Sequence, residues 1–372
     1  MLRIDGLRFR DFRNYETFSI DGLHDLTVFI GPNAAGKTNV IEGIQLALAC
    51  GSLRGAHTAD MLRWGCSSAR IEARLLSEAR DLTVGVSMGP RTRSYDLNGK
   101  RKRAGEIQGM VPVVSFSPDD LALVKGAHSY RRQALDVLGC QLSAAHRTVR
   151  RDFERLVKHK NALLKGDASP ALLESVDAML VPAGARLYRF RHALMAKLTA
   201  CMQEAYADIS GSQELVETSY VPSWESDAAR RAAEASPVSF AYDRAQAEAS
   251  MESALRARSA EEHARGRAVV GPHHDHVELF LNGRNAASFA SQGQQRSLVL
   301  AWKMAEVSVV HAMTGAAPVL LLDDVMSELD AARRASLTAV LGRCPQTFVT
   351  ATDLSCFDGA FLGDARICRL GE

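Results

Sequence analysis

One segment, residues 31–38, constrains the fold of this chain more than any other. It reads Gly-Pro-Asn-Ala-Ala-Gly-Lys-Thr and follows the pattern G-x-x-x-x-G-K-[ST] at every fixed position. A short apolar run at 26–30 precedes it, and Ile41 and Ile44 follow it at helical spacing. A strand, a glycine-rich loop and a helix in this order are typical of a phosphate-binding loop. The flanking strand and helix argue against the alternative, a chance glycine-rich turn.

Each position of this loop has a physical task. The glycines let backbone N–H groups turn toward phosphate oxygens, and the helix N-terminus adds partial positive charge. Lys37 is expected to reach the β- and γ-phosphates of ATP, and the Thr38 hydroxyl is expected to bind Mg²⁺. The predicted nucleotide-binding residues of the loop are Gly31, Pro32, Asn33, Ala34, Ala35, Gly36, Lys37 and Thr38.

A second apolar run, residues 319–322, ends in Asp323 and Asp324. In sheets of this type, ligands bind at the carboxyl ends of the strands. We therefore expect Asp323 to complete the Mg²⁺ shell and Asp324 to orient or deprotonate an attacking water. By itself the pattern also suits an ordinary strand exit. With the loop at 31–38, it predicts a catalytic set of Lys37, Asp323 and Asp324.

The class of ATPase is indicated by Ser-Gln-Gly-Gln-Gln-Arg at 291–296, which opens an apolar helix before the Asp323 strand. It resembles the signature of ABC-type ATPases, in which a helix N-terminus binds the γ-phosphate of ATP held by a second subunit. The resemblance assigns Ser291, Gly293 and Gln294 to the nucleotide and implies an ATP-dependent homodimer. A plain helix cap is the alternative. Ser327 and Asp330 resemble the loop that crosses the same dimer interface.

The pattern along the chain predicts one α/β domain built from both ends, with a mainly helical lobe inserted between them. Strand patterns dominate the first third, including an Asn-Gly hairpin turn at 98–99. Helical spacing dominates the middle, and strand runs return near residue 267. We expect the ABC-type ATPase domain to comprise residues 1–125 plus 266–372, and the helical lobe residues 126–265. Within the lobe, 210–237 is expected to be a loop and 241–265 a helix.

Several further segments resemble the RecF family of bacterial DNA-repair ATPases, from end to end and in the same order. They are Arg-Asp-Phe-Arg-Asn-Tyr at 10–15, Phe-Ser-Pro-Asp-Asp-Leu at 116–121, Tyr-Arg-Arg at 130–132 with Leu135-Asp136, Gly-Pro-His at 271–273, and Asp-Asp-Val-Met-Ser-Glu-Leu-Asp at 323–330. The resemblance implies ATP- and Mg²⁺-dependent dimerisation, binding of double-stranded DNA and of single/double-strand junctions, and weak DNA-stimulated ATP hydrolysis. It also implies action with RecR and RecO in loading RecA at gaps.

The chain also departs from the family pattern. The family's G-P-H-R-D-D reads Gly-Pro-His-His-Asp-His at 271–276. Three histidines and an aspartate could suggest a metal site, but neighbours in an extended strand point to opposite faces, so we prefer a varied family motif. The acid after Asp323 is Asp324, where most ABC ATPases have Glu; an Asp at this position is usual in the RecF family, and its shorter side chain suggests slow hydrolysis.

The net charge is only +2, so any DNA-binding surface must be local. Two basic clusters are candidates, although each also suits a solvated face. The predicted DNA-contacting residues are Arg101, Lys102 and Arg103 beside the Asn-Gly turn, Arg147 and Arg151 on a helical face, and Arg54 after the first helix. An ATP-gated clamp that acts on a protein partner instead of DNA stays open as the alternative.

The seven cysteines are scattered without a C-x-x-C pair, which favours reduced thiols over a zinc site or a disulfide frame. The first residues contain no apolar signal core. No apolar stretch reaches the length of a membrane span without interruption. We therefore expect a cytoplasmic protein without a membrane partner.

Overall fold

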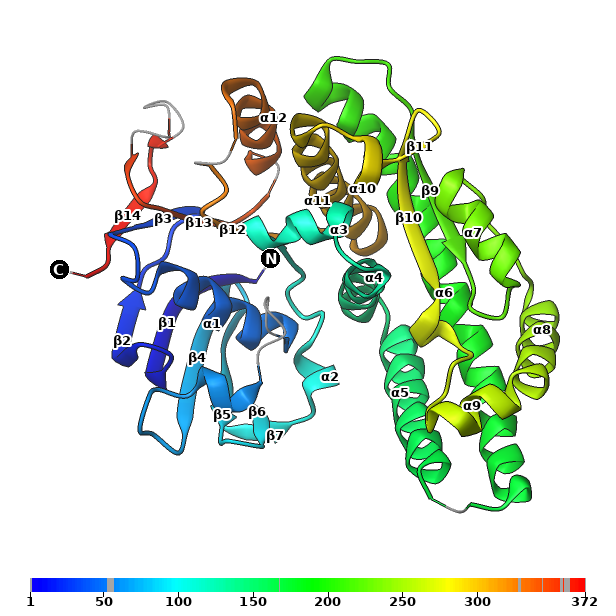
Figure 1. The fold of residues 1–372 in the computed structure, drawn as a ribbon. Coiled ribbons are helices and arrows are strands. Elements are labelled where there is room, and N and C mark those ends of the chain that lie inside the picture. Colours follow the sequence, from blue (N-terminus) through cyan, green and yellow to red (C-terminus); the bar gives the residue numbers. More distant parts are fainter. Residues whose placement is uncertain are drawn as a thin grey trace. The chain divides into compact units, whose positions relative to one another are not determined.

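The computed structural model describes residues 2–51, 57–166, 168–326, 329–342, 344–354, 357 and 362–371 (Figure 1). The chain forms two compact units, one of residues 1–120 with 306–372 and the other of residues 121–305. Residues 266–305 thus belong to the second compact unit, because the strand at His276–Leu281 pairs with Val216–Val221. The boundaries of the ATPase domain at 125/126 and 265/266 remain a prediction, since compactness alone does not define a family domain.

The first unit contains a parallel sheet of five strands in the order β14-β3-β13-β12-β8. Three of its strands are apolar runs that are buried almost throughout, as expected for a sheet covered on both faces. The strands are β3 (Leu26–Ile30), β8 (Val113–Phe116), β12 (Val319–Asp323), β13 (Thr347–Ala351) and β14 (Arg366–Arg369). The strands predicted at 26–30, 319–322 and 347–350 are confirmed.

The same unit contains an antiparallel sheet of six strands in the order β2-β1-β4-β5-β6-β7. Its strands are β1 (Arg3–Phe12), β2 (Tyr15–Asp21), β4 (Ala69–Ser77), β5 (Arg80–Met88), β6 (Arg93–Leu97) and β7 (Lys100–Lys102). The predicted hairpin turn joins β6 to β7, with positive φ at both Asn98 (52°) and Gly99 (73°). Such angles are those of the turn that an Asn-Gly pair favours.

Helix α1 (Lys37–Ala49) and the two sheets share one hydrophobic core, which includes Phe9, Ile44, Val86 and Phe348. Phe9 packs so closely on α1 that a side chain at Gly43 would meet its ring at 2.4 Å. The core therefore fixes the helix that follows the glycine-rich loop. Other short elements of the unit are η1 (Thr58–Met61), α2 (Ala104–Ile107), η2 (Pro118–Leu121) and α12 (Ala331–Leu341).

The second unit is mainly helical, which confirms the predicted helical character of the inserted lobe. Its helices are α3 (Ala122–Lys125), α4 (His128–Leu142), α5 (Ala144–Leu164), α6 (Pro170–Ser210), α7 (Asp227–Ala235), α8 (Arg244–Ala257), α9 (Ser259–Arg265), η3 (Pro272–His274) and α10 (Ala286–Phe289). Helix α11 (Gln292–Thr314) contains the boundary with the first unit. In the parts of the chain that the structure describes, no helix is apolar over a length that could cross a bilayer.

Two predictions for this unit are wrong. Residues 210–237 are not a loop, because they contain β9 (Val216–Val221) and α7. Strand β9 is the edge of an antiparallel sheet with β10 (His276–Leu281) and β11 (Arg284–Asn285), so its pairing partner lies far away in sequence. The single helix expected at 241–265 is instead two helices, α8 and α9, which meet at Arg258.

Candidate nucleotide-binding site

The glycine-rich loop leaves the carboxyl end of β3 and enters α1 in a conformation that requires glycine at its last turn. Gly36 has φ of 95°, and a side chain there would lie 2.6 Å from the Tyr15 hydroxyl and 2.7 Å from Asn14. Ala34 also has positive φ, at 68°. These angles belong to the left-handed region, which turns backbone N–H groups to one side of the loop.

Lys37, the first residue of α1, folds back over the loop. Its ammonium group donates hydrogen bonds to the carbonyl oxygens of Gly31 (2.8 Å) and Pro32 (3.0 Å), and its side chain is buried. The loop carbonyls therefore satisfy a buried charge at the place where phosphate oxygens are expected. An incoming triphosphate would exchange these neutral acceptors for charged ones.

Three hydroxyl and carboxylate groups converge at the carboxyl ends of β12 and β13. The Thr38 hydroxyl donates to Asp323 Oδ1 at 2.9 Å, and the Thr350 hydroxyl donates to the same oxygen at 2.8 Å. The Asp324 N–H donates to the Thr350 hydroxyl at 2.9 Å, and Asp324 has φ of 55°. The structure thus brings Thr38 together with Asp323 and Asp324, which lie far from it in the sequence.

Thr350 is a residue that the sequence analysis missed. It lies on β13, which pairs with β12 in parallel and places Thr350 beside Asp323. Its one sequence signal is its position at the end of a buried strand, and many threonines share that position. The hydroxyl is fully buried and fixes both aspartates, so it is a positioning group.

The turn between β1 and β2 supports the loop and α1. Arg13 makes two hydrogen bonds to the buried Glu42 carboxylate of α1, at 2.7 and 3.0 Å. Asn39 donates to Asn14 at 2.7 Å, and the Tyr15 hydroxyl donates to the Ala35 carbonyl at 3.4 Å. Burial raises the pKa of Tyr15 to about 12, so the phenol stays protonated as a donor. The Arg-Asn-Tyr portion of the N-terminal motif therefore contacts and supports the nucleotide loop and α1.

The donor set suits Mg²⁺, which prefers hard oxygen ligands. The Thr38 hydroxyl and the Asp323 carboxylate lie side by side, and Asp323 is buried at the strand end. Burial of a carboxylate beside neutral hydroxyls is costly unless a cation or further donors neutralise it. The two predicted metal ligands therefore fit a divalent cation at this position.

Comparisons with known proteins agree with this geometry. The family described as RecF/RecN/SMC N-terminal domain matches residues 3–363. A DNA replication and repair protein RecF of Heliobacterium modesticaldum is 34% identical over 376 residues, which cover 99% of this chain and 97% of the relative. A RecF of Myxococcus xanthus is 37% identical, over 98% of this chain and 94% of the relative.

The chain belongs to the RecF family of DNA replication and repair proteins.

Solved structures support the same assignment. The recombination mediator protein RecF with ATP, from the RecFOR pathway, superposes with a TM-score of 0.86 at 26% identity. The match covers 96% of this chain and 94% of that structure. The Smc head domain of Pyrococcus furiosus shares the fold, with a TM-score of 0.51 at 14% identity. The predicted α/β fold of the ABC-type ATPase family is therefore confirmed.

The signature segment of this RecF-family chain lies in the second unit and caps α11. The Gln294 N–H donates to the Ser291 hydroxyl (3.2 Å), and the Ser291 N–H donates to the Gln294 side chain (2.8 Å). This reciprocal pair is a capping box. The Gln294 amide also donates to Glu214 at 2.7 Å. Ser291 therefore caps α11, as the alternative of a plain helix cap predicted. Ser291 is also exposed, so a further contact is still possible.

The two predicted dimer-loop residues have different outcomes. Asp330 caps α12, because its carboxylate accepts the Arg333 N–H at 2.9 Å and pairs with the Arg333 side chain. A role for Asp330 across a dimer interface remains a prediction. Ser327 lies outside the described residues.

Two family motifs in the second unit form a buried polar network. Asp136 accepts two hydrogen bonds from Arg191, at 2.8 and 2.6 Å, and a third contact from His146 at 3.2 Å. Asp275 accepts from the Tyr220 hydroxyl at 2.8 Å. Arg132 donates to the Asp275 carbonyl. Asp136, Arg191 and Asp275 are buried and hydrogen-bonded, so the family segments at 130–136 and 271–276 help to hold this unit together.

The predicted DNA-contacting residues lie in different settings. Arg101 and Arg103 are exposed beside the hairpin turn, and Lys102 pairs with Glu106 at 2.9 Å. Arg147 is half-buried and donates to the Cys140 carbonyl, whereas Arg151 is exposed and lies 3.1 Å from Asp152. Arg54 lies outside the described residues. Of these, the hairpin arginines are the freest to meet a phosphate backbone.

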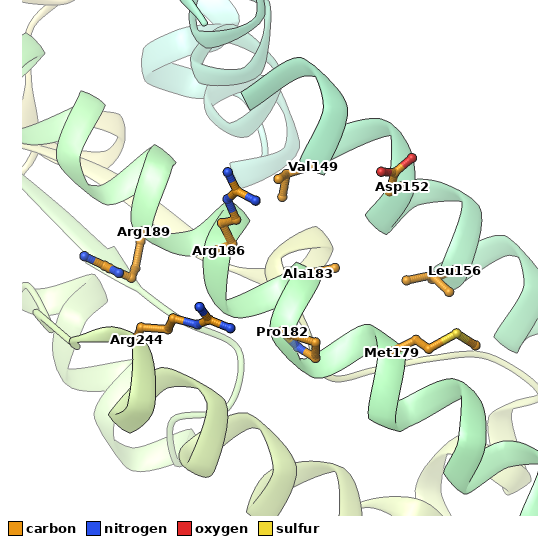
Figure 2. A pocket seen from close by; sticks show the side chains of 9 residues that line it. All are labelled: Val149, Asp152, Leu156, Met179, Pro182, Ala183, Arg186, Arg189 and Arg244. Carbon is orange, nitrogen blue, oxygen red and sulfur yellow. The ribbon is translucent and has the colours of Figure 1, made fainter. Parts of the chain in front are cut away.

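A pocket of about 490 Å³ lies between α5, α6 and α8 in the second unit (Figure 2). Its lining contains three arginines, with Arg186 and Arg189 on α6 and Arg244 on α8. Pro182 lies inside α6 at the pocket wall. Neither Arg147 nor Arg151 is part of this lining. Arg186, Arg189 and Arg244 are therefore basic groups on α6 and α8 that the sequence analysis did not name.

Proposed function

We propose that this RecF-family chain is an ATP-gated clamp on double-stranded DNA. ATP with Mg²⁺ binds at residues 31–38, two chains close around two nucleotides, and closure forms the DNA-binding surface. Slow hydrolysis reopens the dimer. In repair and replication the clamp acts at single/double-strand junctions, with RecR and RecO, to promote loading of RecA at gaps.

The observation that carries the proposal is the convergence of Thr38 and Thr350 on Asp323 beside Lys37. Lys37 would bind the β- and γ-phosphates, while Thr38 and Asp323 would hold Mg²⁺. Mg²⁺ supplies charge neutralisation of the phosphates when it is bound. Asp324, whose N–H is fixed by Thr350, would orient the attacking water.

Ser291, Gly293 and Gln294 supply the contact between two chains. They lie at the N-terminus of α11, where Ser291 is exposed and Gly293 and Gln294 are half-buried, and such a helix end attracts an anion. In the proposed dimer this end of one chain binds the γ-phosphate of ATP held by its partner. ATP then favours the closed state because this contact exists only there.

Backbone contacts would hold the DNA. Arg101 and Arg103 are exposed and positively charged, but they do not lie on a helix that could enter a DNA groove. We therefore expect them to bind the phosphate backbone and not to read the bases. Binding of this kind weakens steeply with salt. Arg54, Lys102, Arg147 and Arg151 remain further proposed DNA contacts.

A second candidate is an ATP-gated clamp on a protein partner. The net charge of only +2 and the pairing of Lys102 and Arg151 with carboxylates favour it over a strongly basic DNA groove. The nucleotide chemistry would be the same, and only the clamped molecule would differ.

The test is a titration of labelled double-stranded DNA with the full-length chain in Mg·ATP or in Mg·ADP. Two variants are compared in Mg·ATP, Ser291→Arg and the matched control Ser288→Arg. Both add one positive charge to an exposed position near the start of α11, but only position 291 is at the helix cap. ATP affinity of each variant is measured in parallel with a fluorescent nucleotide.

We expect tight DNA binding only in Mg·ATP, loss of that binding in Ser291→Arg, and retention in Ser288→Arg, with ATP still bound by both. Equal, weak binding under all conditions would exclude the DNA clamp and favour the protein-partner clamp. DNA binding that is ATP-dependent but unaffected at position 291 would exclude the contact between subunits.

A further inference from the structure

Three side chains from distant parts of the second unit converge at one end of its small sheet. They are His128 at the start of α4, Glu234 near the end of α7 and His276 at the start of β10. One ligand-type atom from each lies within 4.8 Å of the others. The two imidazole rings are stacked, with centroids 4.1 Å apart.

His276 Nδ1 is the group that most needs a partner. It is buried and makes no hydrogen bond within the described chain, and the nearest carboxylate oxygen, Glu234 Oε1, is 3.9 Å away. A buried ring nitrogen without a partner is costly. Two ligand atoms that each lie ~2.1 Å from the same tetrahedral ion are separated by a fixed distance. The distance between His276 Nδ1 and Glu234 Oε1 is about 0.5 Å longer than that separation.

The surroundings of His128 match the second shell of a metal-binding histidine. Its Nδ1 lies 3.1 Å from the Val277 carbonyl oxygen and 3.4 Å from the Glu278 carboxylate. A metal-binding histidine commonly donates one ring N–H to a carbonyl or a carboxylate, so that its other nitrogen faces the ion. Nδ1 of His128 also lies 3.3 Å from the Val277 N–H, so its neighbours occupy Nδ1 and leave Nε2 as the ring nitrogen available to an ion.

The nearby guanidinium groups have partners of their own. The Glu278 carboxylate accepts from Arg131 at 3.1 Å, Arg230 pairs with Asp227, and Arg132 donates to the Asp275 carbonyl.

We propose that His128, Glu234 and His276 form a binding site for a divalent transition-metal ion such as Zn²⁺. Two imidazoles and one carboxylate leave a fourth position for water, and imidazole ligands select zinc-like ions over Mg²⁺. The ion would tie α4, α7 and β10 together. The site does not include the other residues of the histidine-rich segment. His273 and His274 lie 3.4 and 3.2 Å from the Ala268 carbonyl, and Asp275 is bonded to Tyr220.

The experiment uses the full-length chain without nucleotide, stripped of metal by a chelator and then titrated with Co²⁺ and with Zn²⁺. The visible absorption of Co²⁺ reports its coordination, and calorimetry gives the stoichiometry. The variants are Glu234→Gln and His276→Asn, with His159→Asn as the control. His159 is an exposed histidine on α5 outside the cluster. Glu234 is half-exposed, so its variant is expected to fold.

We expect about one equivalent of metal per wild-type chain, with a melting temperature that rises on metal addition. Each cluster variant should weaken binding at least about tenfold and abolish the thermal shift, while His159→Asn behaves as wild type. No saturable binding by the wild type would overturn the site. Equal binding by wild type and both cluster variants would also overturn it, because the metal would then lie elsewhere.

Discussion

The hydroxyl of Thr350 donates to the carboxylate of Asp323 at 2.8 Å and accepts the N–H of Asp324 at 2.9 Å. One side chain on β13 therefore fixes both acidic residues that end β12. The Thr38 hydroxyl reaches the same Asp323 oxygen from α1. The position of the two carboxylates thus depends on the neighbouring strand as well as on their own.

We expect Thr350→Val to lower kcat for ATP hydrolysis by about 10–100-fold while ATP affinity changes little. Valine keeps the shape of the side chain but removes both hydrogen bonds. Steady-state kinetics and nucleotide binding separate the two effects. Thr350→Ser should restore most of the rate, because it returns the hydroxyl.

The matched control for this prediction is Thr347→Val on the same strand. The Thr347 hydroxyl is buried and makes no hydrogen bond within the described chain. Its removal should therefore be neutral or slightly stabilising. A similar loss of kcat in both variants would contradict a specific role for Thr350.

Replacing Arg13 should destabilise the nucleotide loop through α1. Arg13→Ala leaves the buried Glu42 carboxylate without its two guanidinium hydrogen bonds, at an expected cost of about 3 kcal/mol in the free energy of unfolding. Denaturant unfolding measures this loss, and nucleotide titration should show weaker ATP binding. Arg8→Ala is the control. Arg8 lies 3.5 Å from Asp21, both side chains are exposed, and the expected cost is below about 1 kcal/mol.

The buried network around Asp136 predicts a pH dependence of stability. Burial alone raises the pKa of Asp136, but the charge and hydrogen bonds of Arg191 and His146 outweigh it and hold the pKa far below its ordinary 3.8. Because the folded pKa is the lower one, the contribution is complete above about pH 4 and falls by about 1.4 kcal/mol per pH unit below it.

Asp136→Asn should test this contribution directly. At pH 7 it should reduce the free energy of unfolding by about 3–5 kcal/mol, because it breaks a buried ion pair. The difference from wild type should shrink as the pH falls from 4 to 2. A difference that stays constant over this range in urea unfolding would contradict the assignment to the Asp136 charge.

Asp324→Asn should separate hydrolysis from clamping. An amide cannot take a proton from water, so kcat should fall by at least about 100-fold while ATP-dependent DNA binding persists. Release of bound DNA after removal of free ATP should become slower, which a competition assay measures. Asp364→Asn, an exposed carboxylate before β14, is the control and should behave as wild type. Rapid release from the Asp324 variant would show that hydrolysis does not reopen the clamp.

Much of the nucleotide site could be predicted from the sequence, because its signals are local. The loop at 31–38 combines a fixed residue pattern with a strand before it and a helix after it, and both neighbours are confirmed. The Asn98-Gly99 turn and the Ser291 cap are local for the same reason. Each needs only two to four consecutive residues of a given type to set its backbone geometry.

Other features depended on pairing between distant segments. Strand β9 carries no distinctive pattern of its own and forms because β10, far along the chain, pairs with it. The ends of β12 and β13 meet because two parallel strands share a register, which places Thr350 beside Asp323. The sequence alone contains no signal for either register.

The family, the nucleotide loop and the acidic strand end follow from residue types at fixed short spacings, so the amino-acid sequence was enough to predict them. Which polar groups are buried together follows only from how the chain packs in three dimensions. Glu42 meets Arg13, Asp136 meets Arg191, and His128 meets His276 across segments that packing alone brings into contact. Hydrogen bonds and ion pairs act over a few ångströms, so their partners follow from the fold and not from sequence distance.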